Sequence, residues 1–77
     1  MSTTVCEYPS LCIDGERLRV ERTGRGCYEL CRIDKRGRRI RAMTMQISRT
    51  TAFDHLMVAR SRKGSVIGEL DPPDLVA

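Results

Sequence analysis

Aromatic residues are scarce in this chain, which contains no tryptophan and only Tyr8, Tyr28 and Phe53. Sheets that bind RNA by stacking bases need several exposed aromatic side chains, so that class of module fits poorly. The 77 residues form one domain, spanning 1–77, near the lower size limit at which a hydrophobic core suffices by itself. With 40% hydrophobic and 31% charged residues, the composition is that of a folded protein. We therefore expect a small globular domain of modest stability, with loose tails at 1–4 and 71–77.

Long apolar runs are also missing, and none approaches the roughly 20 residues that a membrane helix needs. The N-terminal stretch "MSTTVCEYPS" has neither the basic start nor the apolar centre of a signal peptide. The sequence therefore predicts a cytoplasmic protein without a membrane partner. In that compartment the four cysteines are expected to be thiols.

Recognisable catalytic and metal-binding motifs are lacking. His55 is the only histidine, and no serine or cysteine stands at a spacing that ties it to this residue. "GERLRVERTGRG" lacks the glycine and Lys-Ser/Thr pattern of a phosphate-binding loop. The spacings between Cys6, Cys12, Cys27 and Cys31 are not those of paired zinc knuckles, and on a strand the last two lie about 13 Å apart. The sequence thus predicts no enzymatic activity, no cofactor and no metal site.

Turn signals divide the first two thirds of the chain into strands. Asp14-Gly15 is a two-residue hairpin signal, Gly24-Arg25 is expected to form a second one, and Gly37 suits the left-handed end of a three-residue loop. The candidate strands are 4–13, 16–22, 27–33 and 38–48.

The hydrophobic period then changes from that of a strand to that of a helix. In "SRTTAFDHLMVARSRKG", Thr51 and Asp54 resemble a capping box, Phe53, Leu56 and Met57 follow helical spacing, and Gly64 ends the helix. "SVIGEL" is a candidate short last strand. The predicted fold class is α+β, an antiparallel sheet of about four hairpin-connected strands with one helix on one face. A single helix also argues against helix-turn-helix binding.

The turns set a register, since directly opposed residues of antiparallel strands point to the same face. The expected pairs are Leu11 with Leu18, Val20 with Glu29, and Cys31 with Arg41. The face covered by the helix then contains Leu11, Ile13, Leu18, Val20, Cys27, Cys31, Ile33, Met43, Met45 and Ile47. The open face contains Arg17, Arg19, Tyr28, Leu30, Arg32, Arg38, Ile40 and Ala42. A shift of one residue in the 23–26 turn would instead place Tyr28 and Leu30 in the core.

Positive charge is concentrated in the middle of the chain. Residues 16–41 carry nine arginines and one lysine against four acids, and "KRGRRIR" at 35–41 is read as the tip and start of a hairpin. Arginines on an open sheet face can hold phosphates or carboxylates, although they can also merely solvate that face. The candidate residues for binding a polyanion or partner are Arg17, Arg19, Tyr28, Arg32, Lys35, Arg36, Arg38, Arg39 and Arg41.

The layout of residues 11–67, with hairpins such as "GCYELCRIDKRGRRIRA", resembles several small anti-CRISPR and other anti-defence proteins of bacteriophages. That resemblance implies non-catalytic obstruction of a nucleic-acid-handling complex in the bacterial cytoplasm. Its partner would be the acidic surface of a protein or nucleoprotein complex. Two alternatives are a module that binds nucleic acid directly and a homodimeric regulatory or structural subunit joined through Leu30, Ile40 and Ala42. Either a monomer or a homodimer is compatible with the sequence.

Overall fold

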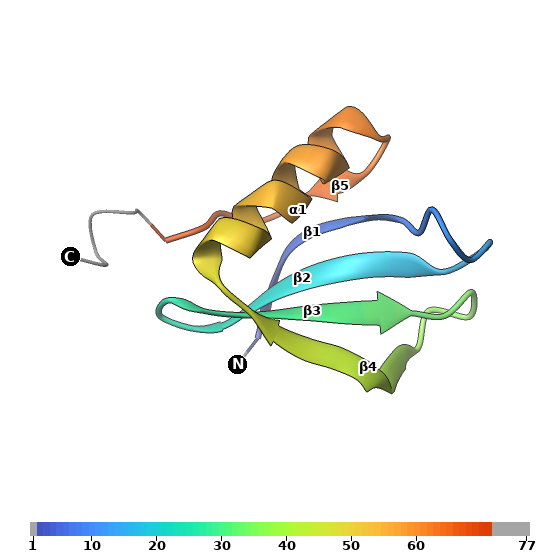
Figure 1. Cartoon of the computed structure of the whole chain (residues 1–77), viewed down its shortest axis with the longest axis horizontal. Coiled ribbons are helices and arrows are strands. Elements are labelled where there is room, and N and C mark those ends of the chain that lie inside the picture. The colour runs from blue at the N-terminus through green and yellow to red at the C-terminus, as the bar shows by residue number, and fades with distance from the viewer. Residues whose placement is uncertain (1, 72–77) are drawn as a thin grey trace.

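One antiparallel sheet and one helix make up the protein (Figure 1). The computed structural model describes residues 2–71. The sheet has the strand order β4-β3-β2-β1-β5, and α1 packs on one of its faces. In chain order the elements are β1 (Thr3–Pro9), β2 (Arg17–Gly24), β3 (Cys27–Ile33), β4 (Arg39–Ile47), α1 (Arg49–Ser61) and β5 (Ser65–Val66). The predicted α+β fold is confirmed, and no helix in the described part is long and apolar enough to cross a membrane.

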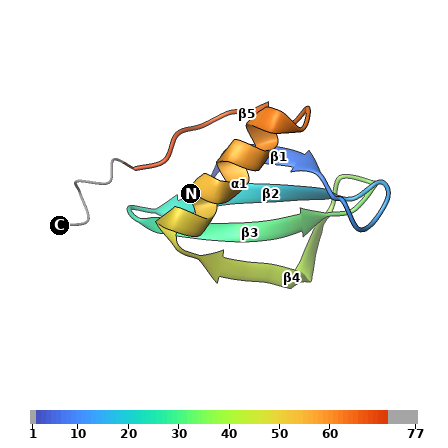
Figure 2. The same ribbon diagram turned by 45° about the horizontal axis from the view of Figure 1, so that its top comes forward.

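The main core lies between α1 and the sheet. Ala52, Leu56 and Ala59 form the buried line of the helix. The strands contribute Val5, Cys6, Tyr8, Val20 and Tyr28, with Leu18, Leu30 and Ile47 partly buried beside them. Figure 2 shows the helix crossing the strands diagonally and leaving most of β4 uncovered. Small alanines on the buried line let the helix approach the sheet closely, which offsets the shortage of large aromatic residues.

The connection between β1 and β2 differs from the expected two-residue hairpin. β1 ends at Pro9, and Tyr8 is the residue that pairs with Leu18, so the expected pairing of Leu11 was wrong. Asp14-Gly15 does form a tight turn, with Gly15 at a φ of 82° and the Glu16 N–H donating to the Ile13 carbonyl. This turn lies at the tip of a longer loop, residues 10–16. The Ser10 hydroxyl accepts hydrogen bonds from two loop N–H groups, which holds the chain in the loop instead of extending the strand.

Leu11 and Ile13 are consequently exposed in this loop and do not belong to the core. The N-terminal tail is also shorter than expected, because β1 begins at Thr3. At the other end Asp71 is tied down by four polar contacts, described below, and residues 72–77 of the expected tail lie outside the described range.

The hairpin between β2 and β3 follows the alternative register. Its two-residue turn is Arg25-Gly26, with Gly26 at a φ of 72°, and a bulge lies at Thr23. Val20 therefore pairs with Leu30, and Tyr28 pairs with Arg22. The expected pairing of Val20 with Glu29 was wrong, because a change of one residue reverses the face of every side chain that follows.

As a result Tyr28 and Leu30 lie on the helix face, where Tyr28 is buried in the core. Cys31 and Ile33 are buried as expected, but they lie on the sheet face opposite the helix and not on the face that the helix covers.

The start of β4 follows the expected three-residue loop. Gly37 has a φ of 83°, its N–H donates to the Asp34 carbonyl, and Arg39 pairs with Ile33. Between the pairs Arg32–Ile40 and Leu30–Met45, however, β4 has four residues where β3 has one. This bulge at 41–44 removes the expected pairing of Cys31 with Arg41. Because β4 has an odd number of extra residues in this segment, the alternation of faces is reversed, and the side chain of Met45 lies on the helix face of the sheet.

The helix cap lies three residues before the expected cap, Thr51. Ser48 is the N-cap, and its hydroxyl accepts a hydrogen bond from the Thr51 N–H. At the other end, Lys63 takes the left-handed conformation at a φ of 56°. Gly64 is required for a different reason. A Cβ at this position would lie 2.6 Å from the Glu7 carbonyl oxygen, so only glycine lets the chain pass this close to β1.

Candidate functional site

The sheet face opposite the helix carries arginines and glutamates that pair with one another. Glu7 of β1 accepts hydrogen bonds from Arg17 at 2.5 Å and from Arg19 at 2.9 Å. Burial alone would raise the pKa of Glu7, but the two guanidinium groups outweigh it and hold this pKa below its ordinary value. The carboxylate is therefore charged at neutral pH, and it neutralises the two strand arginines nearest to it.

Glu21 of β2 continues this arrangement towards β4. Its carboxylate is 7% exposed, pairs with Arg39, and lies 3.8 Å from Arg19. We call the row formed by Glu7, Arg17, Arg19, Glu21 and Arg39 the ion-pair ladder. The ladder joins β1, β2 and β4, and its Glu21–Arg39 pair links positions 18 residues apart in the chain. An arginine that is shared between carboxylates is less available to an external anion than a solvated one.

A small second core lies under the ladder. Cys31 and Ile33 are buried, and their directly opposed neighbours on β2 are Arg19 and Arg17. Opposed side chains of antiparallel strands are close enough for the aliphatic stems of arginine to cover an apolar neighbour. The strand arginines therefore have a structural role, because they shield apolar residues while the glutamates fix their guanidinium groups.

The predicted binding residues do not share one face. Arg17, Arg19 and Arg39 belong to the ladder. Arg32 lies on the helix face of the sheet, where it pairs with Glu16 at 2.8 Å. The expected position of Tyr28 on an open face is wrong, since it is buried in the core. The remaining predicted residues, Lys35, Arg36, Arg38 and Arg41, are exposed near the start of β4.

Exposed cations gather at the end of the sheet where β1 and β3 finish. The β3–β4 turn carries Lys35, Arg36 and Arg38, and the helix ends there with Arg60, Arg62 and Lys63. These six residues are called the basic end. Arg38 has a loose ion pair with Asp34 at 3.7 Å, and the other five have no carboxylate partner within residues 2–71. Sequence reasoning missed the helix residues, although their position in the last turn was visible as a cluster in "ARSRKG".

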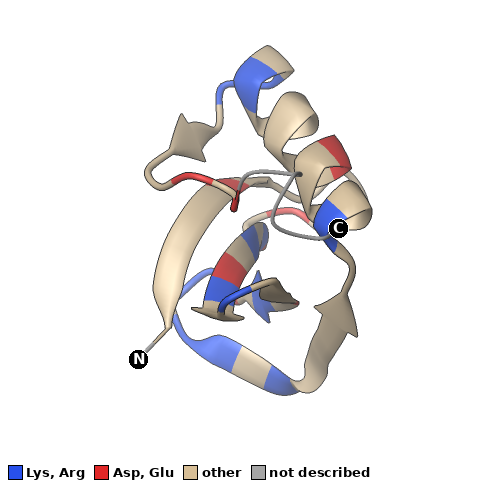
Figure 3. Ribbon diagram, turned by 90° about the vertical axis from the view of Figure 1, so that its left-hand side faces the viewer, with Lys and Arg blue, Asp and Glu red and all other residues tan. Residues whose placement is uncertain are grey.

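Two close approaches show that these segments meet at one end. A Cβ on Gly64, just after the helix, would touch Tyr8 near the end of β1. A Cβ on Gly15 in the 10–16 loop would lie 3.0 Å from Lys35. Figures 1 and 2 show the C-terminal end of α1 and the β3–β4 turn towards the same end of the sheet. Figure 3 shows basic segments both along the strands and at the ends of the helix. The strands run along the longest axis of the molecule (Figure 1), so the basic end is at most about as wide as the two shorter extents, 26 and 18 Å. An end of this size can meet one anionic surface.

A polar cluster at the opposite end was also missed. The Asp71 carboxylate accepts a hydrogen bond from the Gly26 N–H at 2.6 Å and pairs with Arg22 at 2.8 Å. Its N–H donates to the Tyr28 hydroxyl, and its carbonyl accepts from Arg49. The Gly26 N–H and Arg22 hold the pKa of Asp71 below its ordinary value. No sequence pattern links positions 22, 26 and 71, so only the tertiary structure reveals this polar cluster.

His55 lies beside the buried line of the helix and contacts β1. The Tyr8 hydroxyl and His55 Nδ1 are 2.5 Å apart, and the two rings stack with centroids at 5.9 Å. Burial lowers the pKa of His55 and raises that of Tyr8. A neutral histidine that accepts a hydrogen bond from a tyrosine fixes the helix against β1, which accounts for this histidine without catalysis.

Within residues 2–71, one group of side chains has atoms close enough to bind a metal. The ligand atoms of Glu21, Glu29 and Cys31 lie within 4.8 Å of one another. However, Glu21 is engaged by Arg39, and burial raises the pKa of the Cys31 thiol, which favours the protonated form. Its sulfur lies 3.9 Å from a Glu21 oxygen, consistent with a weak S–H hydrogen bond. A metal here would have to displace the arginine and remove the thiol proton.

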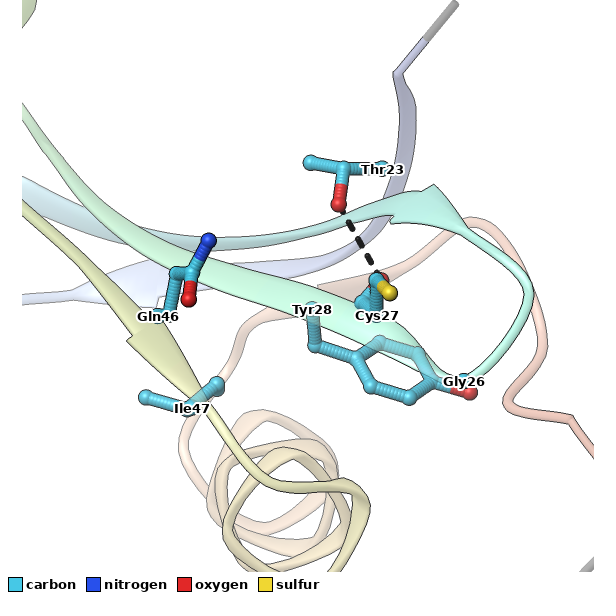
Figure 4. A pocket seen from close by; sticks show the side chains of 6 residues that line it. All are labelled: Thr23, Gly26, Cys27, Tyr28, Gln46 and Ile47. Carbon is cyan, nitrogen blue, oxygen red and sulfur yellow. Dashed lines mark hydrogen bonds between the residues drawn. The ribbon is translucent and has the colours of Figure 1, made fainter. Parts of the chain in front are cut away.

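A shallow pocket of about 160 Å³ lies beside the β2–β3 turn (Figure 4). It is lined by Thr23, Gly26, Cys27, Tyr28, Gln46 and Ile47. This volume is below the roughly 300 Å³ at which small-molecule sites begin. Cys27 is exposed, so its thiol is accessible, but no histidine, lysine, arginine or carboxylate is among the lining residues.

Comparisons with protein-family models, with curated proteins and with solved structures gave no significant match to this chain. The candidate site therefore rests on the geometry above.

Proposed function

We propose that this chain is a small non-enzymatic binding protein that attaches to an anionic surface through its basic end. The observation that carries the proposal is the division of the cations into two sets. Arg17, Arg19 and Arg39 of the ladder are paired with glutamates, whereas the six cations of the basic end are exposed, and five of these six have no carboxylate partner in the described range. Outside the basic end, Arg25 and Arg41 are also exposed. Excess charge at one end favours an encounter in one orientation.

The resemblance in layout to small anti-defence proteins of bacteriophages supports a more specific form of this proposal. In that form, the anionic surface belongs to a nucleic-acid-handling complex in the bacterial cytoplasm, and the bound protein obstructs it. Guanidinium groups suit this task because they contact phosphates and carboxylates in a bidentate manner. Direct binding of nucleic acid is the second candidate, because the 26 Å second extent spans roughly seven base-pair steps at 3.4 Å each.

Salt dependence tests the basic end. Binding of fluorescent 20-nucleotide single-stranded and duplex oligonucleotides is measured by anisotropy between 50 and 200 mM salt. Each phosphate contact contributes about 0.9 to the slope of log K against log salt. R36A and R62A should each weaken binding and reduce the slope by about 1. R25A is the matched control, since Arg25 is exposed at the opposite end and has no carboxylate partner in residues 2–71. An equal loss for R25A would mean diffuse attraction and would contradict the proposal.

A pull-down from bacterial lysate separates the two forms of the proposal. Wild type, R36A/R62A and R25A are used as baits, with and without nuclease treatment. Retention of one protein complex after nuclease, by wild type and R25A but not by R36A/R62A, supports obstruction of a complex. Loss of all partners after nuclease supports direct binding of nucleic acid.

A further inference from the structure

Four large apolar side chains remain exposed beside the helix. They are Met43 and Met45 of β4 and Phe53 and Met57 of α1, with exposed fractions between 44% and 58%. We call them the apolar strip. Together they expose on the order of 300–400 Å², comparable to the largest apolar patch of a typical monomer, and such patches are often functional.

Helix geometry and strand pairing place these side chains on the same side of the molecule. His55 faces β1 through its contact with Tyr8. Phe53 and Met57 lie on the other flank of the helix, which must face β3 and β4 in the observed strand order. On the sheet, Met45 pairs with Leu30, a residue that packs against the core beneath the helix.

Met43 lies on the same face of the sheet, because the Arg32 guanidinium contacts its sulfur at 3.7 Å. The strip therefore follows the junction between the helix flank and the part of the sheet that the helix leaves uncovered (Figure 2).

Two exposed arginines and one exposed carboxylate border the strip. Arg60 lies one helical turn beyond Met57 on the same flank. Arg41 is exposed in the β4 bulge two residues before Met43. Asp54 lies one helical turn before Met57 and is the only border carboxylate on the helix, so the border carries a net positive charge. A partner of the strip would therefore be apolar where it meets the methionines and acidic opposite Arg60 and Arg41.

A second copy of this chain fits the strip poorly. A two-fold interface brings the same patch of both copies together, so the two border arginines of each copy would meet only one border carboxylate, Asp54, of the other. The exposed area is also about half of the roughly 800 Å² per partner that stable interfaces bury. The β4 bulge interrupts the edge at which two sheets would otherwise join.

We infer that the apolar strip binds one acidic amphipathic helical segment of a partner protein, with apolar side chains seated on Met43, Met45, Phe53 and Met57 and carboxylates facing Arg60 and Arg41. Unbranched methionines adapt to such segments, and helices that bind in grooves present apolar residues at helical spacing. This inference adds a protein-specific contact to the proposed function and depends on it only for the negative charge of the partner.

The test uses the full chain and a synthetic 18-residue helical peptide with leucines along one face and glutamates elsewhere. Binding is measured by fluorescence anisotropy at 150 mM salt. A second peptide replaces the leucines by glutamine, and a third replaces the glutamates by lysine. Wild type should bind the first peptide at least ten-fold more tightly than either control. M45Q and M57Q should each weaken this binding at least ten-fold, whereas L11Q, which alters an exposed residue in the 10–16 loop, should not.

Melting temperatures establish that M45Q and M57Q are folded, as expected for half-exposed positions. The inference is overturned if the first peptide does not bind, if the glutamine peptide binds equally, or if both methionine variants bind like wild type. It is also overturned if light scattering shows a dimer that M57Q dissolves, which assigns the strip to a second copy. If M45Q loses oligonucleotide binding as strongly as it loses peptide binding, the strip is assigned to nucleic acid. Loss of oligonucleotide binding in R36A/R62A alone concerns the proposed function and leaves the peptide result standing.

Discussion

Replacing Glu21 by glutamine is the most direct test of the ion-pair ladder. The Glu21 carboxylate is 7% exposed, pairs with Arg39, lies 3.8 Å from Arg19, and lies 3.9 Å from the Cys31 sulfur. Glutamine keeps the shape of the side chain but removes its charge. Arg39 then has no counter-charge, whereas Arg19 keeps its ion pair with Glu7.

The expected loss is about 2–3 kcal/mol. A hydrogen bond to a charged group contributes about 1.5–3 kcal/mol and a neutral one about 0.5–1.5, so the change in the Arg39 bond costs about 1–2 kcal/mol. The repulsion that the unneutralised Arg39 meets from the nearby Arg19 adds about 1 kcal/mol. A 77-residue domain has a total stability of roughly 4–11 kcal/mol, so this is a large fraction of it. At about 4–8 °C per kcal/mol, the melting temperature should fall by about 10–20 °C.

Urea unfolding followed by far-UV circular dichroism at pH 7 measures this loss. E69Q is the matched control, because Glu69 is exposed and has no ion pair within the described residues, and its stability should stay within about 0.5 kcal/mol of wild type. The double variant E21Q/R39Q isolates the coupling, which should exceed about 1 kcal/mol. If E21Q is as stable as wild type, the ladder does not hold the strands together, and its arginines become available for binding again.

Three further outcomes are expected. Stability should fall as pH drops below about 4.5, because the lowered pKa of Glu7 means that its ion pairs stabilise the fold above that pH and are lost on protonation; E7Q should show a smaller fall in urea titrations across this range. G64A should lose about 1–3 kcal/mol from the clash with the Glu7 carbonyl, whereas G24A, which has room for a Cβ, should be nearly neutral by thermal unfolding. A thiol reagent should modify Cys12 and Cys27 rapidly and the two buried cysteines only on unfolding, and four equally fast thiols would contradict the burial.

Local patterns in the sequence determined most of the fold. β3 has the predicted bounds 27–33, and the Gly37 loop adopts the expected left-handed conformation. The predicted helix is present, but of its predicted stripe only Leu56 is buried, while Phe53 and Met57 are exposed. These features depend on residues that are near one another in the chain. For the same reason, the concentration of arginine between positions 16 and 41 was visible at once.

The roles of those arginines were decided by the tertiary structure. A bulge at Thr23 and another at 41–44 change the register, and each shifted residue reverses a side chain from one face to the other. Tyr28 thereby enters the core, while Arg17, Arg19 and Arg39 come to lie beside glutamates.

Pairing of charges depends on positions that are far apart in the chain and adjacent only across strands. The sequence by itself determined a small α+β domain rich in arginine. Only the tertiary structure decided which of its cations stabilise the sheet and which remain exposed to a partner, because a charge pattern along the chain does not specify its neighbours in space.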